Sequence, residues 1–235
     1  MKKTAFLIAL CALCLIALTA CASSQPTAPT ETAAPTAEAT AAPTDAPAES
    51  ASPTADSAGS KILIVYFSVP DDRDNSYVEI GGERLGNTQY MAYVIQQNTG
   101  ADIFRIQPKT PYPTDHSALL SVAQEEIRTN ARPEIDGTIE NFDSYDTVFV
   151  GYPNWNADLP YIMYTFFETY DFSGKNIVPF NTHGGSGFSG TRETIAQLEP
   201  NATLLEGKSI SRSSIEGAEQ EIIDWLNSIG MLKAQ

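Results

Sequence analysis

The run Lys61-Ile-Leu-Ile-Val-Tyr-Phe67 is aliphatic or aromatic at every position after the lysine, and three of its residues are β-branched. An uninterrupted run of this kind is typical of a strand buried on both faces, as in a parallel sheet. The run Thr147-Val-Phe-Val-Gly151 repeats the pattern, and weaker runs cover 101–106, 176–180 and 202–205. The sequence therefore predicts five strands.

The stretches between these runs carry apolar residues at helical spacing. They predict helices over 87–98, 114–130, 159–170 and 191–198, and a last helix after a Ser213-x-x-Glu216 capping box. The apolar stripe of this last helix consists of Ile215, Ile222, Trp225, Leu226 and Ile229, and Gly230 is expected to end it. Alternation of strands and helices predicts an α/β fold, a three-layer α/β/α sandwich with a five-stranded parallel sheet.

The N-terminus has the pattern of an export signal. Lys2 and Lys3 precede an uncharged segment, 4–20, that is rich in Leu, Ile and Ala. The tetrapeptide Leu18-Thr19-Ala20-Cys21 resembles a bacterial lipobox, in which the cysteine is acylated and becomes the first residue of the mature chain. An ordinary signal peptide that ends in Cys21, or an uncleaved anchor, is the alternative. We therefore expect a lipid-anchored protein on the extracytoplasmic face of the cell membrane.

Residues 22–60 consist of Ala, Thr, Pro, Ser and acidic residues with few others, and contain no aromatic residue, Val, Ile or Leu. Such a segment cannot bury enough apolar surface to offset the entropy lost on folding. The expected organisation is a signal peptide over 1–20, a lipidated Cys21 followed by a disordered tether up to 60, and one folded domain over 61–235.

Cysteine usage excludes several chemistries. The three cysteines are Cys11, Cys14 and Cys21, so none lies in the predicted folded domain. A disulfide, a thiolate nucleophile and an iron–sulfur cluster are therefore excluded there. With His116 and His183 as the only histidines, we expect no transition-metal site.

The net charge of the predicted domain limits the kinds of partner that it can bind. Five of the 29 acidic residues lie in 22–60 and two of the 14 basic residues lie at positions 2 and 3. Residues 61–235 thus hold 24 acids and 12 bases, a net charge of about −12. Nucleic-acid binding requires a basic face, so we expect none. The acidic surface suits either solubility or the attraction of positively charged partners.

Ligands of such sheets bind at the carboxyl ends of the strands. Ser68 follows the first strand, and Gly86-Asn87-Thr88 opens the first helix after a long polar stretch. Free N–H groups and the positive end of a helix dipole favour an anion there, although a simple helix cap is the alternative. Neither G-x-x-x-x-G-K-[ST] nor G-x-G-x-x-G occurs, which argues against a nucleoside-triphosphate loop and a dinucleotide fold.

Two later loops complete this predicted edge. Gly151-Tyr-Pro-Asn-Trp-Asn-Ala157 places Trp155 where it could stack on a planar ligand or pack on its own helix. Asn181-Thr-His-Gly-Gly-Ser-Gly-Phe188 exposes many backbone donors, which suits the approach of a planar ring or of a phosphate.

The set Tyr66-Phe-Ser68, Gly86-Asn-Thr88, Gly151-Tyr-Pro-x-Trp155 and Phe180-x-Thr-His-Gly-Gly-Ser-Gly187, in this order, resembles the flavodoxin family. It is most similar to bacterial flavodoxin-like proteins that carry the Gly-Gly-Ser-Gly loop, and it covers the chain from about residue 61 onward. The resemblance implies a flavodoxin-like fold that binds FMN. The residues implied to hold the FMN phosphate are Ser68, Gly86, Asn87 and Thr88; those beside one side of the isoalloxazine ring are Pro153, Asn154, Trp155 and Asn156; those beside its other side are Thr182, His183, Gly184, Gly185, Ser186 and Gly187.

One departure from the family pattern is an insertion of about 15 residues within 69–85. It is acidic through Asp71, Asp72, Asp74, Glu79 and Glu83. The insertion could fold over the flavin as a lid, or it could spoil the phosphate site. An acidic wall of this kind would lower the reduction potential of the flavin.

Three functions are compatible with the sequence. The first is an FMN-dependent redox protein, which passes electrons to a partner protein or reduces a small acceptor such as a quinone. The second is a hydrolase that uses His183 with Ser186 or Ser189, although neither serine stands in a G-x-S-x-G elbow. The third is a flavin-free binding or surface lipoprotein that keeps the fold. A catalytic residue is not assigned, and His183 is either a hydrogen-bond donor to the ligand or a loop residue.

Overall fold

The computed structural model of the chain describes residues 61–233. The predicted signal, the lipidation site Cys21 and the tether lie outside the described residues. Within 61–233, no helix combines the length and the apolar character needed to cross a membrane.

The core of the domain is a parallel sheet with the strand order β10-β8-β7-β1-β4. These strands are β1 (Ile62–Tyr66), β4 (Asp102–Arg105), β7 (Thr147–Pro153), β8 (Asn176–His183) and β10 (Lys208–Ser211). A further short strand, β9 (Thr203–Leu204), pairs in parallel with the beginning of β8, whereas β10 pairs with its end. The predicted five-stranded sheet is confirmed, with its last position divided between two segments.

The sequence predicted β9 but missed β10. The reason is local, because Lys208-Ser-Ile-Ser211 has one apolar residue, Ile210, and gives no hydrophobic run. Pairing with β8 and burial of Ile210 hold this segment in the sheet despite its polar sequence.

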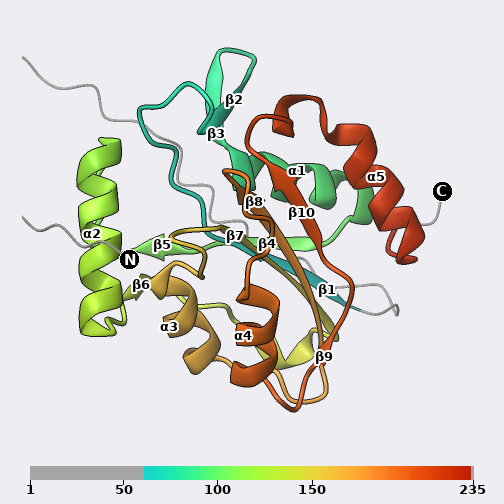
Figure 1. Cartoon of the computed structure of the whole chain (residues 1–235). Helices are drawn as coiled ribbons and strands as arrows, with labels where there is room; N and C mark the ends of the chain where they lie inside the picture. Colours follow the sequence, from blue (N-terminus) through green and yellow to red (C-terminus); the bar gives the residue numbers. More distant parts are fainter. Residues whose placement is uncertain (1–60, 234–235) are drawn as a thin grey trace, which may run out of the picture. The chain divides into compact units, whose positions relative to one another are not determined.

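Helices cover both faces of the sheet (Figure 1). On one face lie α1 (Asn87–Thr99) and α5 (Glu219–Ser228), and on the other lie α3 (Tyr161–Thr169) and α4 (Thr191–Leu198). The remaining helix, α2 (His116–Thr129), packs beside α3. The predicted three-layer α/β/α sandwich is confirmed.

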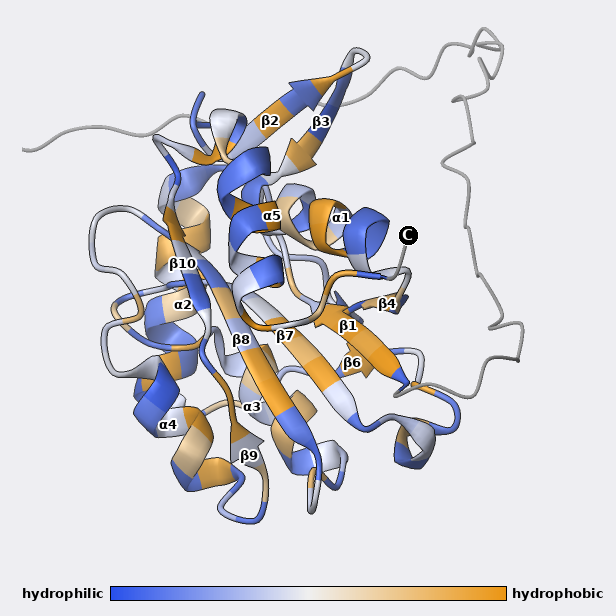
Figure 2. Cartoon of the chain, turned by 90° about the vertical axis from the view of Figure 1, so that its right-hand side faces the viewer, coloured by the Kyte–Doolittle hydropathy of each residue, from blue (hydrophilic) through white to orange (hydrophobic). Residues whose placement is uncertain are grey.

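Strand β1 shows why an uninterrupted apolar run is required. Ile64 and Tyr66 pack in the cluster beneath α1 and α5, whereas Leu63, Val65 and Phe67 pack in the cluster beneath α3 and α4. Each fully buried side chain of this size contributes about 1.5–3 kcal/mol from removal of apolar surface from water. Figure 2 shows the same preference, with hydrophobic residues concentrated along β1, β7 and β8.

Gly151 and Phe180 are direct neighbours on β7 and β8. The ring of Phe180 lies over Gly151 so closely that a β-carbon at position 151 would collide with it. Glycine at this position therefore makes room for a fully buried aromatic side chain.

The insertion forms an antiparallel hairpin of β2 (Tyr77–Ile80) and β3 (Glu83–Gly86), which the sequence did not predict. The turn consists of Gly81 and Gly82, whose φ angles are +63° and +88°. Positive φ at both central residues is the requirement of a two-residue hairpin turn that matches the twist of the strands. The hairpin stands above the sheet next to the start of α1 (Figure 1).

A second small antiparallel pair, β5 (Gln107–Pro108) with β6 (Ile135–Asp136), brackets α2. The 3-10 turn η1 (Phe142–Ser144) precedes β7.

The predicted start of the last helix was wrong. The chain makes a 3-10 turn, η2 (Ile215–Gly217), before α5 begins at Glu219, and no side chain within 61–233 caps either element. The Ser213 hydroxyl lies 2.9 Å from the Ser211 hydroxyl, so this side chain is used in a local turn and not in a capping box. Gly230, with φ of +71°, follows the helix as expected.

Candidate functional site

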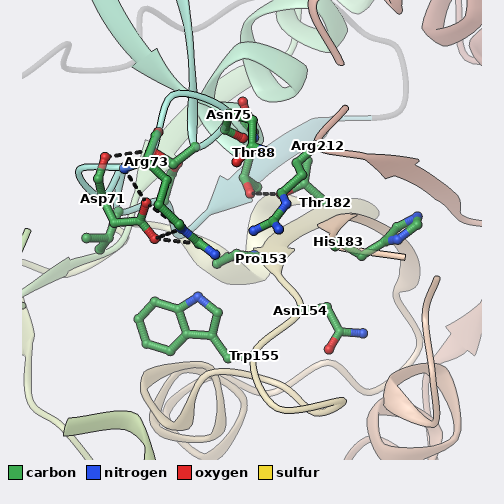
Figure 3. A pocket seen from close by; sticks show the side chains of 15 residues that line it. Asp71, Arg73, Asn75, Thr88, Pro153, Asn154, Trp155, Thr182, His183 and Arg212 are labelled. Atoms are coloured by element: carbon green, nitrogen blue, oxygen red, sulfur yellow. Dashed lines mark hydrogen bonds and ion pairs between the residues drawn. The ribbon is translucent and has the colours of Figure 1, made fainter. Parts of the chain in front are cut away.

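A pocket lies at the carboxyl ends of the central strands, where the start of α1 meets the ends of β7 and β8 (Figure 3). Its lining residues are Ser68, Val69, Asp71, Arg73, Asn75, Ser76, Asn87, Thr88, Pro153, Asn154, Trp155, Thr182, His183, Gly184 and Arg212. They come from five segments: the turn after β1, the start of α1, the end of β7, the end of β8 and the turn after β10. This is the edge at which open α/β sheets bind ligands.

The start of α1 supplies the anion-binding feature of the pocket. Gly86 is the N-cap residue, and no side chain in the described part of the chain caps this helix. Asn87 and Thr88 are buried, and both line the pocket. The Asn87 N–H is already bonded to the carbonyl oxygen of Ser76. The N–H groups that follow it and the helix dipole favour a negatively charged ligand, so this wall of the pocket is electropositive.

Gly86 packs closely against the turn that follows β1. A β-carbon at position 86 would collide with the Ser68 hydroxyl and lie 3.3 Å from Cδ of Pro70. Glycine therefore lets the helix start approach the end of β1, which brings the Ser68 and Thr88 hydroxyls to the same pocket.

Thr88 joins this wall to the opposite one. Its hydroxyl lies 2.9 Å from the hydroxyl of Thr182, near the end of β8, and both side chains are buried. The α1 start and the β8 end are thus fixed relative to each other before any ligand enters.

The floor beside β7 is formed by Trp155. Its ring packs edge-on against Phe67 and Tyr112, with ring centroids 5.5 and 5.3 Å away. Trp155 and Asp158 pair across a two-residue turn, in which Asn156 and Ala157 have φ of +52° and +65°. The turn and the aromatic neighbours fix the indole at the edge of the pocket (Figure 3).

Hydrogen bonds from neighbouring side chains and backbone hold the loop after β8 in place. The His183 Nδ1 atom accepts a hydrogen bond of 2.9 Å from the N–H of Gly185, and burial lowers the pKa of His183. A neutral imidazole with this contact carries its proton on Nε2. The Asn154 side chain donates to the carbonyl oxygen of Gly187, which links the β7 and β8 loops.

The insertion forms a further wall that the sequence prediction did not assign. Arg73 and Asp71 line the pocket, and the Arg73 Nε atom lies 2.9 Å from both carboxylate oxygens of Asp71. Asp71 also lies 3.0 Å from Nδ1 of His116, the first residue of α2. Burial alone would raise the pKa of Asp71, but hydrogen bonds and charge from Arg73, with a hydrogen bond from His116, hold it below its usual value.

The expected acidic wall is wrong. Among the described lining residues Asp71 is the one acid, whereas Arg73 and Arg212 both contribute guanidinium groups. Arg212 follows β10 and lies against Gly184. The other acids of the insertion, Asp72, Asp74, Glu79 and Glu83, do not line the pocket.

Two buried acceptors in the pocket lack partners. Oδ1 of Asn87 and Oδ1 of Asn154 make no hydrogen bond within residues 61–233. An unpaired buried carbonyl is costly, so a ligand of this pocket is expected to carry hydrogen-bond donors as well as an anionic group.

Nine of the residues implied by the resemblance line the pocket: Ser68, Asn87, Thr88, Pro153, Asn154, Trp155, Thr182, His183 and Gly184. Five do not: Gly86, Asn156, Gly185, Ser186 and Gly187. These five support the lining residues through tight turns and backbone contacts. The sequence analysis missed Arg73 and Arg212 because neither belongs to a recognised motif. The available signals were a lone arginine in an acidic insertion for Arg73 and a lone arginine after a strand for Arg212.

The hydrolase hypothesis has no geometric support. In the described part of the chain His183 makes no hydrogen bond to Ser186 or Ser189, and its Nδ1 atom is already engaged by the Gly185 N–H. No group of three or more His, Cys, Asp or Glu residues that could hold a metal ion occurs within 61–233.

The parallel strand order, with helices on both faces and a pocket at the carboxyl ends of the strands, defines a doubly wound α/β protein. A sequence model of the family described as Flavodoxin matches residues 82–229, which is more than half of the chain. The chain belongs to the flavodoxin family.

Solved structures share this fold. The chain is 31% identical to a candidate flavoprotein from Bacteroides eggerthii, with a TM-score of 0.59, covering 73% of this chain and 99% of that one. A candidate flavoprotein from Bacteroides uniformis is 23% identical, with a TM-score of 0.56 over 72% of this chain and 99% of that one. A flavoprotein from Lactobacillus acidophilus, solved in complex with FMN, is 17% identical, with a TM-score of 0.50 over 67% of this chain and 97% of that one. The search of curated proteins gave no match.

Proposed function

We propose that this chain is an FMN-binding redox protein. The observation that carries the proposal is the convergence of the start of α1, which no described side chain caps, the Trp155 turn and the end of β8 on one pocket. The family membership and the FMN complex of the Lactobacillus acidophilus neighbour support the same cofactor.

The residues present fit FMN. The anionic phosphate suits the N–H groups of the α1 start and the hydroxyls of Ser68 and Thr88. The unpaired Oδ1 atoms of Asn87 and Asn154 require donors, which the ribityl hydroxyls and the ring N–H of FMN provide. Trp155 offers an aromatic surface for the ring, and the Arg212 guanidinium lies against Gly184 on the side of β8.

Bound FMN supplies the redox chemistry, since it takes up and releases one or two electrons. The protein binds and orients it. The Thr88–Thr182 contact fixes the spacing of two walls, and His183 in its neutral form braces the Gly184-Gly185 backbone while its Nε2–H remains available as a donor.

Electrons would pass to a partner protein or to a small acceptor, which would make the chain an FMN-dependent oxidoreductase in the second case. The net charge of about −12 over 61–235 favours a positively charged partner through long-range attraction. Such steering weakens with ionic strength, so the rate of electron exchange with a basic partner protein should fall as salt is added.

We also propose that the domain works outside the cytoplasm on a lipid anchor at Cys21. The apolar segment 4–20 followed by a lipobox-like tetrapeptide supports this location, and the Pro- and Ala-rich segment 22–60 suits a spacer. Incorporation of a labelled fatty acid should occur in the wild-type chain and be absent in Cys21→Ser.

The absorbance spectrum of the purified protein tests the redox proposal. An FMN protein is yellow, and the pigment released by denaturation is identified as FMN by its mass. A colourless protein that stays colourless after incubation with FMN would favour the flavin-free lipoprotein instead.

A further inference from the structure

We propose that Arg73 of the insertion donates a charge-assisted hydrogen bond to the phosphate of the bound flavin, so that this segment makes the pocket select phosphorylated flavin over riboflavin. The proposal rests on the proposed function and adds to it a binding residue and a basis for selectivity. Arg73 lies outside residues 82–229, the range that the family model matches.

The charge of the ligand favours a cationic donor in addition to the helix start. A phosphomonoester carries a charge of about −1.5 to −2 at neutral pH. The domain itself carries about −12 and therefore repels it. Backbone N–H groups and the hydroxyls of Ser68 and Thr88 give hydrogen bonds and partial charge but no whole positive charge. The Arg73 guanidinium adds a charged donor to the same pocket. The Asp71 carboxylate offsets its net charge, but hydrogen bonds from a guanidinium to an anion are still stronger than those from neutral donors.

Contacts to α1 place the insertion at the phosphate end of the pocket. The N–H of Asn87 donates to the carbonyl oxygen of Ser76 at 3.2 Å, and Nδ2 of Asn87 donates to the carbonyl oxygen of Asn75 at 2.8 Å. The N–H of Ser76 in turn donates to the carbonyl oxygen of Arg73 at 3.0 Å. The segment that bears Arg73 is thus pinned to the first residue of the helix that would bind the phosphate.

Asp71 holds the guanidinium in place. Its side chain is 3% exposed, and it accepts hydrogen bonds from Nε and Nη2 of Arg73. These bonds leave Nη1 of Arg73 without a partner in the described residues, as a donor for an anion. His116 contacts the same carboxylate from the start of α2, so Asp71 and His116 act as positioning residues for Arg73.

The second arginine of the insertion provides a matched control. The Arg84 guanidinium lies 4.3 Å from the ring centroid of Tyr77 and pairs with Glu79 at 3.3 Å. Arg84 does not line the pocket, so Arg84→Gln makes the same change of charge in the same segment without removing the proposed phosphate contact.

The experiment titrates FMN and riboflavin into flavin-free wild-type protein, Arg73→Gln and Arg84→Gln, and records the phosphorus NMR shift of bound FMN. Loss of a charge-assisted hydrogen bond should weaken FMN binding by about 10- to 100-fold in Arg73→Gln and leave riboflavin binding unchanged. Arg84→Gln should bind both ligands as the wild type does. The phosphorus shift should move in Arg73→Gln alone, and Arg73→Lys should recover part of the FMN affinity.

A second variant guards against misfolding. Arg73→Gln leaves the Asp71 carboxylate buried without its main partner, whereas the double variant Asp71→Asn with Arg73→Gln removes both charges. The double variant should show the same loss of preference for FMN over riboflavin.

The outcomes separate the two proposals. Equal losses of FMN and riboflavin affinity in Arg73→Gln, unchanged FMN affinity, or tighter binding of both flavins would overturn the role of Arg73 while leaving FMN binding intact. A wild-type protein that binds neither flavin would overturn the proposed function itself.

Discussion

The hydroxyls of Thr88 and Thr182 lie 2.9 Å apart in the interior of the domain, although the two residues are 94 positions apart in the chain. This contact joins the two walls of the pocket that would hold the charged end and the ring of one ligand. The contact fixes the spacing of these two walls, which reduces the entropy lost when a ligand binds.

Replacement of Thr88 by valine keeps the shape of the side chain and removes the hydroxyl. It leaves the Thr182 hydroxyl buried without its partner, so we expect the free energy of unfolding to fall by about 1–3 kcal/mol. FMN affinity should fall as well. Denaturant unfolding and FMN titration measure the two effects, and Thr88→Ser, which keeps the hydroxyl, should retain most of both. If Thr88→Val unfolded with the wild-type free energy, the contact between the two hydroxyls would not contribute to stability.

Trp155→Ala should weaken FMN binding by about tenfold or more, because it removes an aromatic surface that Phe67 and Tyr112 hold in place. The control is Trp225→Phe, a change in α5 within the other core cluster, which should leave FMN affinity unchanged. The same control leaves Trp155 as the single tryptophan, so its fluorescence should respond to FMN. An unaltered FMN affinity in Trp155→Ala would remove this residue from the site.

Gly151→Ala should destabilise the domain by about 1–3 kcal/mol, because the added methyl group collides with the Phe180 ring. Thermal unfolding of this variant should occur at a lower temperature than that of the wild type. The double variant Gly151→Ala with Phe180→Leu should recover part of the loss. If Gly151→Ala melted at the wild-type temperature, the Phe180 ring would be able to move away from position 151 without loss of stability.

Most of the sheet could be predicted because its strands are buried on both faces and therefore carry unbroken apolar runs, as in Lys61–Phe67. A search for apolar runs could not find β10, because its polar residues are held in the sheet by pairing with β8 and not by their own burial. The capping box at Ser213 failed because Ser211 offered a closer partner for the same hydroxyl.

Some pocket residues could likewise be predicted from the sequence, and others could not. Ser68 and Trp155 follow strands, Thr182 lies at the end of β8, and Thr88 lies at the start of α1, so the topology of the sheet brings them to one edge. Arg73 depends on the path of an insertion, and that path is set by hydrogen bonds to Asn87 that no sequence pattern reveals.

The ion pair of Asp71 with Arg73 should make stability depend on pH at its acidic end. The folded pKa of Asp71 is below its ordinary value, so its stabilising contribution is present above that ordinary value, about 4, and is lost as the pH falls further. The difference in free energy of unfolding between wild type and Asp71→Asn should be positive at pH 7 and shrink below about pH 4. Urea unfolding at several pH values measures it, and a difference that stays constant would contradict the ion pair.

The most direct test of the account is calorimetric titration of flavin-free protein with FMN. The convergence of α1, the Trp155 turn and the end of β8 predicts saturation at one FMN per chain, with affinity lost in Thr88→Val and Trp155→Ala but kept in Arg84→Gln. Absence of binding by the wild type, or binding that none of these pocket substitutions changes, would contradict it.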